Sequence, residues 1–243
     1  MKVWYINLDR RPDRNEAMLK NLEASEVPEE KVRRLEAKDR EAYSSYRALA
    51  DDAVRDGFEC FNSEKERHVQ VQAHTWSYLR ALKKVAAQQE TVLLMEDDYF
   101  LKITYSRLEE LLAEIPDFNI AMLFNTRIRR ECSDYSPNWV TGIPGSGSGC
   151  NILRPDGARW YLSQCMQAFP KTPETVLRDF YPDCPGGVYA LNEVSRKAFI
   201  KDGGWDSDLD TPTMFNGLPN PMHNQGGSGS NEMLTDFGRQ DKV

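Results

Sequence analysis

The chain has 243 residues, 40% of them hydrophobic, and its 38 acidic residues outnumber its 31 Lys and Arg residues to give a formal net charge of −7. This length and apolar content suffice for one large domain or two small ones with a buried core, whereas the acidic balance argues against nonspecific binding to nucleic acid or anionic membranes. The apolar stretches are far shorter than the roughly 20 residues that span a bilayer, no secretory cleavage pattern follows the first apolar run, and the five scattered cysteines include no C-x-x-C pair, so we expect a cytoplasmic protein without disulfides.

Strand and helix patterns alternate through the first half of the chain. KVWYIN and TVLLM have the β-branched, aromatic and apolar content of strands, whereas the apolar residues of the longer segments between them recur at helical spacing. A highly charged, weakly periodic stretch predicts only short helices and loops. The expected elements are, in order, a strand at 2–7, a helix at 11–25, short helices and loops at 25–66, a helix at 69–88 and a strand at 91–95.

The second half continues the alternation. Ser106 and Glu109 form a capping-box pattern for a helix that Pro116 ends, and Asp156 is the expected cap of a later helix. The expected elements are a helix at 106–115, strands at 119–124 and 150–155, a helix at 156–169 and a last core strand at 186–191. Strands interleaved with helices of this length predict an α/β fold with a mainly parallel central sheet flanked by helices.

The last part of the chain differs in composition. After about Pro212 the apolar pattern fades, and the Gly/Ser-rich sequence that follows carries too little apolar surface to fold. We therefore expect one domain at residues 1–220 and a flexible tail at 221–243. The alternative for the tail is that it becomes ordered over a bound ligand.

Three consecutive carboxylates, those of Glu96, Asp97 and Asp98, follow the strand at 91–95. They repel one another unless water or a cation screens them. In open α/β sheets ligands bind beyond the carboxyl ends of the strands, and Mg²⁺ or Mn²⁺ takes oxygen ligands while leaving positions for substrate phosphates. The pattern indicates either a metal–nucleotide site or a solvated acidic turn.

Five motifs occur in order along the chain: VWYINLDRRPDR, HVQVQAHTWSYLRAL, VLLMEDDYFL, GSGSGCNILRPDGARWYL and PETVLRDFY. Together they resemble glycosyltransferase family 25, which includes lipooligosaccharide galactosyltransferases and collagen hydroxylysine galactosyltransferases. The resemblance covers roughly residues 3–191. It implies a GT-A fold, a UDP-sugar donor, a Mn²⁺ or Mg²⁺ ion and inversion at the anomeric carbon.

The resemblance also implies roles for the acidic residues. The family's metal motif falls on Glu96, Asp97 and Asp98, with Asp98 as the best direct ligand and Glu96 beside it. The family's Ser-His pair is Ala-His here, so only His74 carries over as a donor-site residue. His223 is a possible third metal ligand, since imidazole also accepts Mn²⁺; the alternative is an exposed histidine without a role.

The family's opening motif falls on Asn7, Leu8, Arg11 and Arg14, at the end of the first predicted strand, where a nucleotide would lie. The guanidinium groups of Arg11 and Arg14 suit a diphosphate. The alternative is that both arginines only supply surface charge at the start of the following helix.

Two further motifs concern the acceptor. The glycine-rich segment that contains Ser148 matches a family segment with acceptor contacts. Asp179 matches an acid of the last motif and is the candidate for the base that removes the proton of the attacking hydroxyl, or for an acceptor anchor. The alternative for Asp179 is a surface carboxylate paired with Arg178.

The acceptor itself has several candidates. Family usage favours a saccharide, and a hydroxymethylated base in DNA is a second class, for which Arg127, Arg129 and Arg130 would contact phosphates. The same arginines also fit a solvated loop. A protein hydroxyl is a third acceptor class. From outside the enzymes, the remaining candidate is a noncatalytic module that binds a nucleotide sugar or a metal.

Overall fold

The structure is a computed structural model, and it describes residues 1–62, 68–124, 132–142, 147 and 149–202. The chain divides into two compact units, Met1–Gly203 and Gly204–Val243. The second unit lies outside the described residues, and so do the predicted tail and the expected domain boundary near residue 220. Everything below concerns the first unit.

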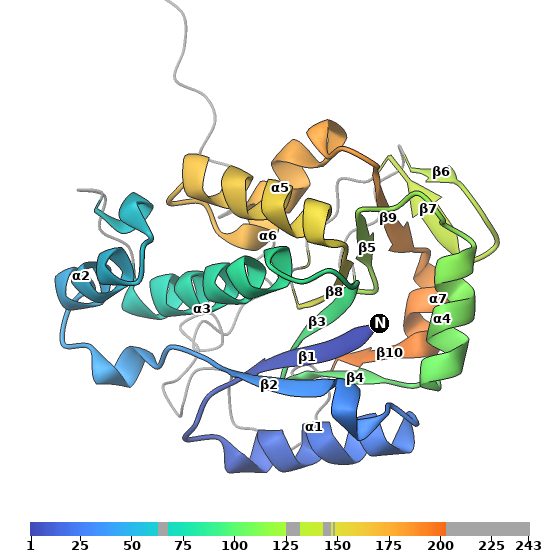
Figure 1. Cartoon of the computed structure of the whole chain (residues 1–243), viewed down its shortest axis with the longest axis horizontal. Helices are drawn as coiled ribbons and strands as arrows, with labels where there is room; N and C mark the ends of the chain where they lie inside the picture. Colours follow the sequence, from blue (N-terminus) through green and yellow to red (C-terminus); the bar gives the residue numbers. More distant parts are fainter. Residues whose placement is uncertain (63–67, 125–131, 143–146, 148, 203–243) are drawn as a thin grey trace, which may run out of the picture. The chain divides into compact units, whose positions relative to one another are not determined.

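An eight-stranded sheet forms the centre of this unit (Figure 1), with the strand order β2-β1-β3-β8-β5-β9-β7-β6. β2, β1 and β3 pair in parallel, as do β5 and β9, whereas β8 and β7 run antiparallel to their neighbours. The mainly parallel α/β sheet that the sequence predicts is therefore confirmed. The strands are β1 (Lys2–Asn7), β2 (Val32–Glu36), β3 (Val92–Glu96), β5 (Ile120–Met122), β6 (Ser133–Asp134), β7 (Trp139–Thr141), β8 (Cys150–Leu153) and β9 (Val188–Leu191).

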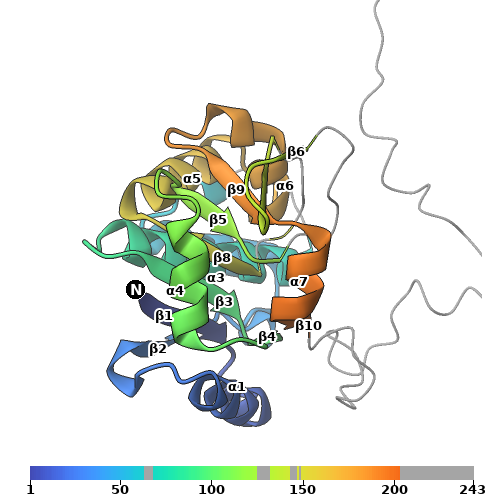
Figure 2. The ribbon, with the colours of Figure 1, turned by 90° about the vertical axis from the view of Figure 1, so that its right-hand side faces the viewer.

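Helices cover both faces of the sheet. Figure 2 shows α5 and α1 on opposite sides of the strands. A second, two-stranded sheet pairs β4 (Tyr99–Leu101) with β10 (Ile200–Asp202). The α-helices are α1 (Pro12–Ala24), α2 (Tyr46–Arg55), α3 (Val69–Ala86), α4 (Tyr105–Ala113), α5 (Pro155–Gln167), α6 (Pro173–Phe180) and α7 (Glu193–Phe199), and the 3₁₀ helices are η1 (Glu29–Lys31), η2 (Arg40–Ala42), η3 (Glu59–Phe61) and η4 (Tyr181–Asp183). Within the described residues, none of the helices combines the length and the apolar character that a membrane span requires.

The central strands β1 and β3 are buried on both faces. On β1, Trp4 and Ile6 join the apolar cluster on the side of α2, α3 and α5, whereas Val3 and Tyr5 join the cluster on the side of α1 and α4. β3 alternates in the same way. Successive side chains of a strand point to opposite faces, so a strand covered on both sides needs apolar residues at nearly every position. This explains why both strands appear in the sequence as short apolar runs.

The predicted helix caps are wrong in two places. The N-cap of α4 is Thr104, whose hydroxyl accepts a backbone hydrogen bond of the first turn, so Ser106 lies inside the helix. The N-cap of α5 is Arg154, because Pro155 occupies the first helical position and Asp156 the next. Proline suits that first position because its missing N–H would have no partner within the helix.

The charged stretch at 25–66 holds more regular structure than its weak periodicity predicts. The expected short helices are present, but α2 extends over ten residues and is capped by the side chain of Ser45. The apolar pattern of the sequence does not predict β2. Only Leu35 of this edge strand is buried, so its sequence carries no apolar run.

Gln72 of α3 is an unusual polar residue of the core. Its side chain is fully buried, and among the described residues neither its amide nitrogen nor its amide oxygen has a hydrogen-bond partner. We expect Gln72→Met to raise the free energy of unfolding by about 1–3 kcal/mol, because a thioether of similar length removes the desolvation cost of an unpaired amide. Denaturant titration followed by circular dichroism measures this change.

Gln89→Met is the matched control, because Gln89 is exposed beyond the end of α3, where we expect a change within about 0.5 kcal/mol. A clear loss of stability in Gln72→Met would contradict the assignment of an unpaired, costly amide.

Candidate functional site

The acidic run lies where β3 ends and a tight turn leads into β4. Val92 and Leu94 face the side of α3, and the next position of the same parity is Glu96. The side chain of Asp97 is therefore directed to the opposite face of the sheet, toward α1. The three carboxylates do not act as one cluster, because adjacent positions at a strand end are directed to different faces of the sheet.

Asp97 is held by groups of the protein. Its Oδ2 accepts a hydrogen bond from Nδ2 of Asn7 at 2.7 Å, and its Oδ1 accepts one from Nη1 of Arg14 at 3.1 Å. Burial raises the pKa of the carboxyl above its ordinary value, while Arg14 and Asn7 act in the opposite direction. Both carboxylate oxygens thus have a donor from the first motif.

Asn7 ends β1 and connects four segments. Its side chain is only 1% exposed, and its Nδ2 also donates to the carbonyl oxygen of Arg11 at 3.2 Å. Its Oδ1 accepts a hydrogen bond from Nε of Arg34 on β2 at 2.8 Å, and Arg34 also pairs with Asp9. The amide of Asn7 is therefore fully used inside the protein, and it shapes the turn between β1 and α1.

His74 lies on α3 and pairs with Glu96 across the other face. Its Nε2 is 3.1 Å from Oε1 of Glu96. Desolvation lowers the pKa of His74, but the carboxylates of Glu96, Asp98 and Glu174 outweigh it and raise the pKa to about 9. At neutral pH the ring is therefore an imidazolium. It stacks on Tyr78, with the ring centroids 6.5 Å apart.

Gly149, the residue before β8, lies beside the acidic turn. The backbone N–H of Glu96 donates to the carbonyl oxygen of Gly149 at 2.7 Å. A Cβ at Gly149 would lie 1.9 Å from Cε2 of Tyr99, so the ring of Tyr99 leaves no room for a side chain here. Glycine is what allows the backbone to approach the acids this closely.

Asp98 completes the acidic turn and is 7% exposed. Its negative charge raises the pKa of His74 and, after the larger effect of burial, helps to raise the pKa of the Cys150 thiol. A buried carboxylate between β3 and β4 is thus electrostatically coupled to the imidazolium of α3.

The placement of the acidic side chains determines which kind of divalent-cation site they suit. No group of three or more His, Cys, Asp or Glu side chains within the described ranges is placed to hold a metal ion. Glu96 is engaged by His74 and Asp97 by Asn7 and Arg14. Mg²⁺ commonly takes one or two carboxylates and completes its shell with water and substrate phosphates. Carboxylates at this turn suit such an open site and do not fit a closed cage.

The chain is similar to solved structures at low sequence identity. No protein-family model matches the chain, and no curated protein matches it in sequence. Among solved structures, the galactosyltransferase LgtC in complex with donor and acceptor sugar analogs is similar at 15% sequence identity and a TM-score of 0.44, over 78% of this chain and 73% of that chain. An active-site mutant of LgtC gives the same identity and TM-score over 78% and 72%. Similarity at this level assigns neither a family nor an activity.

The remaining residues of the opening motif lie beside the site. The backbone N–H of Arg11 donates to the carbonyl oxygen of Leu8 at 3.0 Å, which closes the turn after β1. The guanidinium of Arg11 pairs with Asp13, and this pairing is the main cause that lowers the pKa of Asp13 to about 2. Arg14 points to Asp97 instead. The structure thus brings the opening motif and the acidic turn together.

Asp179 has a different environment, on α6. Its Oδ2 is 2.8 Å from Nζ of Lys171 and its Oδ1 is 2.9 Å from Nε of Arg178. Desolvation raises the pKa of Asp179, but the two cations overcome it and lower the pKa. It is Glu174, at the start of the same helix, whose charge reaches His74.

Arg34 and Glu174 were not identified from the sequence as site residues. Glu174 belongs to the PETVLRDFY motif, so its place in that motif was an available signal, whereas Arg34 lies in a stretch without a motif. Five predicted site residues lie outside the described residues: Arg127, Arg129, Arg130, Ser148 and His223.

Proposed function

We propose that the protein is a metal-dependent glycosyltransferase of the GT-A type, related to family 25, that transfers a sugar from a UDP-sugar to a hydroxyl of a saccharide with inversion. The observation that carries the proposal is the meeting of three motifs at one edge of the sheet. Asn7 and Arg14 of the opening motif are hydrogen-bonded to Asp97. His74 of α3 is within hydrogen-bond distance of Glu96, although these segments are far apart in the sequence. They are the segments that resemble the family.

The residues have distinct roles in this proposal. Asp98, with Glu96 beside it and His223 as a third ligand, would hold Mn²⁺ or Mg²⁺. Such an ion neutralises the charge that grows on the departing diphosphate. His74 places a second positive charge at the same edge of the sheet, since its pKa of about 9 keeps it protonated at neutral pH. Arg11 lies directly before α1. Its guanidinium would release Asp13 and bind a phosphate of the donor instead.

The acceptor hydroxyl must lose its proton during transfer. Asp179 remains our candidate residue on the acceptor side. Its two cationic partners and lowered pKa make it a weak base, so they favour the role of an anchor that accepts hydrogen bonds from sugar hydroxyls over the role of general base.

The proposal is tested by measuring UDP release from a panel of UDP-sugars with Mn²⁺, with Mg²⁺ and with a chelator. We expect metal-dependent release from at least one donor, because many transferases slowly hydrolyse their donor, and faster release with a saccharide acceptor. Binding of UDP without release from any donor would indicate a noncatalytic module. Neither release nor Mn²⁺-assisted binding of UDP in calorimetry would overturn the proposal.

A further inference from the structure

Four side chains form a continuous polar connection on the α1 side of the sheet, and we call it the Asp97 clamp. It consists of Arg34 on β2, Asn7 on β1, Asp97 in the acidic turn and Arg14 on α1. The links are Arg34 Nε to Asn7 Oδ1 at 2.8 Å, Asn7 Nδ2 to Asp97 Oδ2 at 2.7 Å and Arg14 Nη1 to Asp97 Oδ1 at 3.1 Å. The connection therefore joins the middle of β2, the ends of β1 and β3, and α1.

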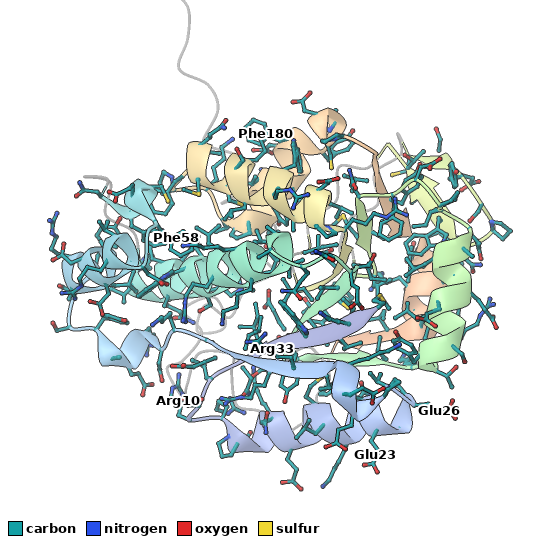
Figure 3. The ribbon with its side chains drawn as sticks, viewed as in Figure 1. Arg10, Glu23, Glu26, Arg33, Phe58 and Phe180 are labelled. Carbon is teal, nitrogen blue, oxygen red and sulfur yellow. The ribbon has the colours of Figure 1, made fainter. Side chains whose placement is uncertain are left out.

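Strand alternation explains why these residues meet. β2 pairs with β1 in a register that places Arg34 opposite Tyr5, whose side chain packs on the α1 side. Asn7 has the same parity as Tyr5 and projects to the same side. Arg33, one position earlier and labelled in Figure 3, is on the other side. Its Cζ lies 5.2 Å from the ring centroid of Trp4, which belongs to the cluster on the α3 side.

The two central members are held mainly by groups of the protein. Nδ2 of Asn7 donates one hydrogen to Asp97 and the other to the carbonyl oxygen of Arg11. Each oxygen of Asp97 accepts a hydrogen bond from a protein donor, and its residue is 9% exposed. The direction of the Asp97 carboxylate is therefore set by two protein donors.

We propose that Asp97 is a positioning residue and that the clamp fixes the direction of its two acidic neighbours. Anchoring Asp97 toward α1 turns Glu96 toward His74 on the other face, because consecutive side chains at a strand end diverge. It also fixes the backbone from which Asp98 projects. This role rests on the proposed function of the same site, and it assigns Arg34 a part in the reaction through Asn7 and Asp97.

The test exchanges the two groups of the central hydrogen bond. Asn7→Asp places two carboxylates in contact, and Asp97→Asn leaves Arg14 without its anionic partner. The double variant Asn7→Asp with Asp97→Asn restores one amide, one carboxylate and two arginines in reversed order. We expect each single variant to lower kcat for UDP release about a hundredfold, since small displacements of reacting groups cost this much.

The double variant is expected to recover activity to within about tenfold of the original enzyme, with KM for the UDP-sugar nearly unchanged, because the reversed pair still anchors position 97. If Asp97 contacts the ion or the diphosphate directly, the double variant will remain as weak as Asp97→Asn. That result, or single variants as active as the original enzyme, would overturn the inference.

Arg34→Gln provides an independent comparison with Arg33→Gln on the same strand. We expect Arg34→Gln to lower kcat about tenfold, because Asn7 then loses the donor that orients its amide. Arg33→Gln should leave kcat unchanged, since its guanidinium lies on the other face. Equal kcat values for the two variants would remove Arg34 from the clamp.

Unfolding of the metal-free protein tests the Asp97 clamp independently of the proposed function. The urea midpoint of the double variant should exceed those of both single variants, whether or not any UDP-sugar is turned over. A midpoint at or below that of the weaker single variant would show that the two side chains are not coupled and would overturn the clamp. Absence of turnover in the original enzyme would instead count against the proposed function.

Discussion

Asp98→Asn is expected to lower metal-dependent UDP release by about a hundredfold or more. A cation at the departing diphosphate supplies several kcal/mol of stabilisation, and about 1.4 kcal/mol corresponds to a factor of ten in rate. His74 fixes the direction of Glu96, and Asn7 and Arg14 fix that of Asp97, so neither acid moves into the place of the lost carboxylate. Initial rates at several Mn²⁺ concentrations measure the effect, and excess Mn²⁺ should restore part of the rate.

Asp134→Asn is the matched control, because Asp134 is an exposed acid of β6 at the far edge of the sheet. Its release rate should equal that of the original protein. If Asp98→Asn and Asp98→Ala both keep the original metal-dependent rate, Asp98 is not the residue that holds the ion.

Trp139→Ala is expected to lower the free energy of unfolding by about 3–5 kcal/mol, the usual cost of deleting a large buried aromatic side chain. Trp139 lies on β7 with no exposed surface, and its Nε1 donates to the carbonyl oxygen of Leu111 of α4 at 2.9 Å. The substitution leaves a cavity and removes one of the hydrogen bonds to the Leu111 carbonyl, which still accepts one from the backbone N–H of Glu114 at 3.2 Å. Because typical domains are stable by about 5–15 kcal/mol, this variant should unfold at a much lower urea concentration.

Trp139→Phe separates the two causes, since it keeps most of the ring volume and removes the hydrogen bond. We expect it to lose less than half as much stability as Trp139→Ala. A loss below about 1 kcal/mol in Trp139→Ala would contradict the tight packing of β7 against α4.

The central strands could be predicted from the sequence, whereas the edge strand could not. β1 and β3 are buried on both faces and therefore consist largely of apolar residues. β2 buries only Leu35 and exposes Arg33 and Arg34. Charged residues protect the edge of a sheet from pairing with other chains. The charged residues that suit β2 to the edge of the sheet are also the reason why apolar periodicity does not predict this strand.

The position of the candidate site could be predicted more fully than its contacts. The end of a strand in an α/β sheet is a general location for ligands, and the acidic run marks it without knowledge of the fold. The pairing of Asp97 with Asn7 and of Glu96 with His74 depends on strand register and helix placement, which the sequence does not display. Strand alternation was available, however, and it argues against treating three consecutive acids as one cluster.

The strand order has a consequence for how the protein acquires its shape during synthesis. β1 contacts β3 through the pair Lys2 and Val92, and β5 lies between β8 and β9. A ribosome must therefore release almost two hundred residues before the middle of the sheet is complete, roughly ten seconds or more at common elongation rates. Until then β5 presents an unpaired edge to the place of β9, and pairings between such distant segments form slowly. Expression at reduced temperature or with chaperones should therefore increase the soluble yield.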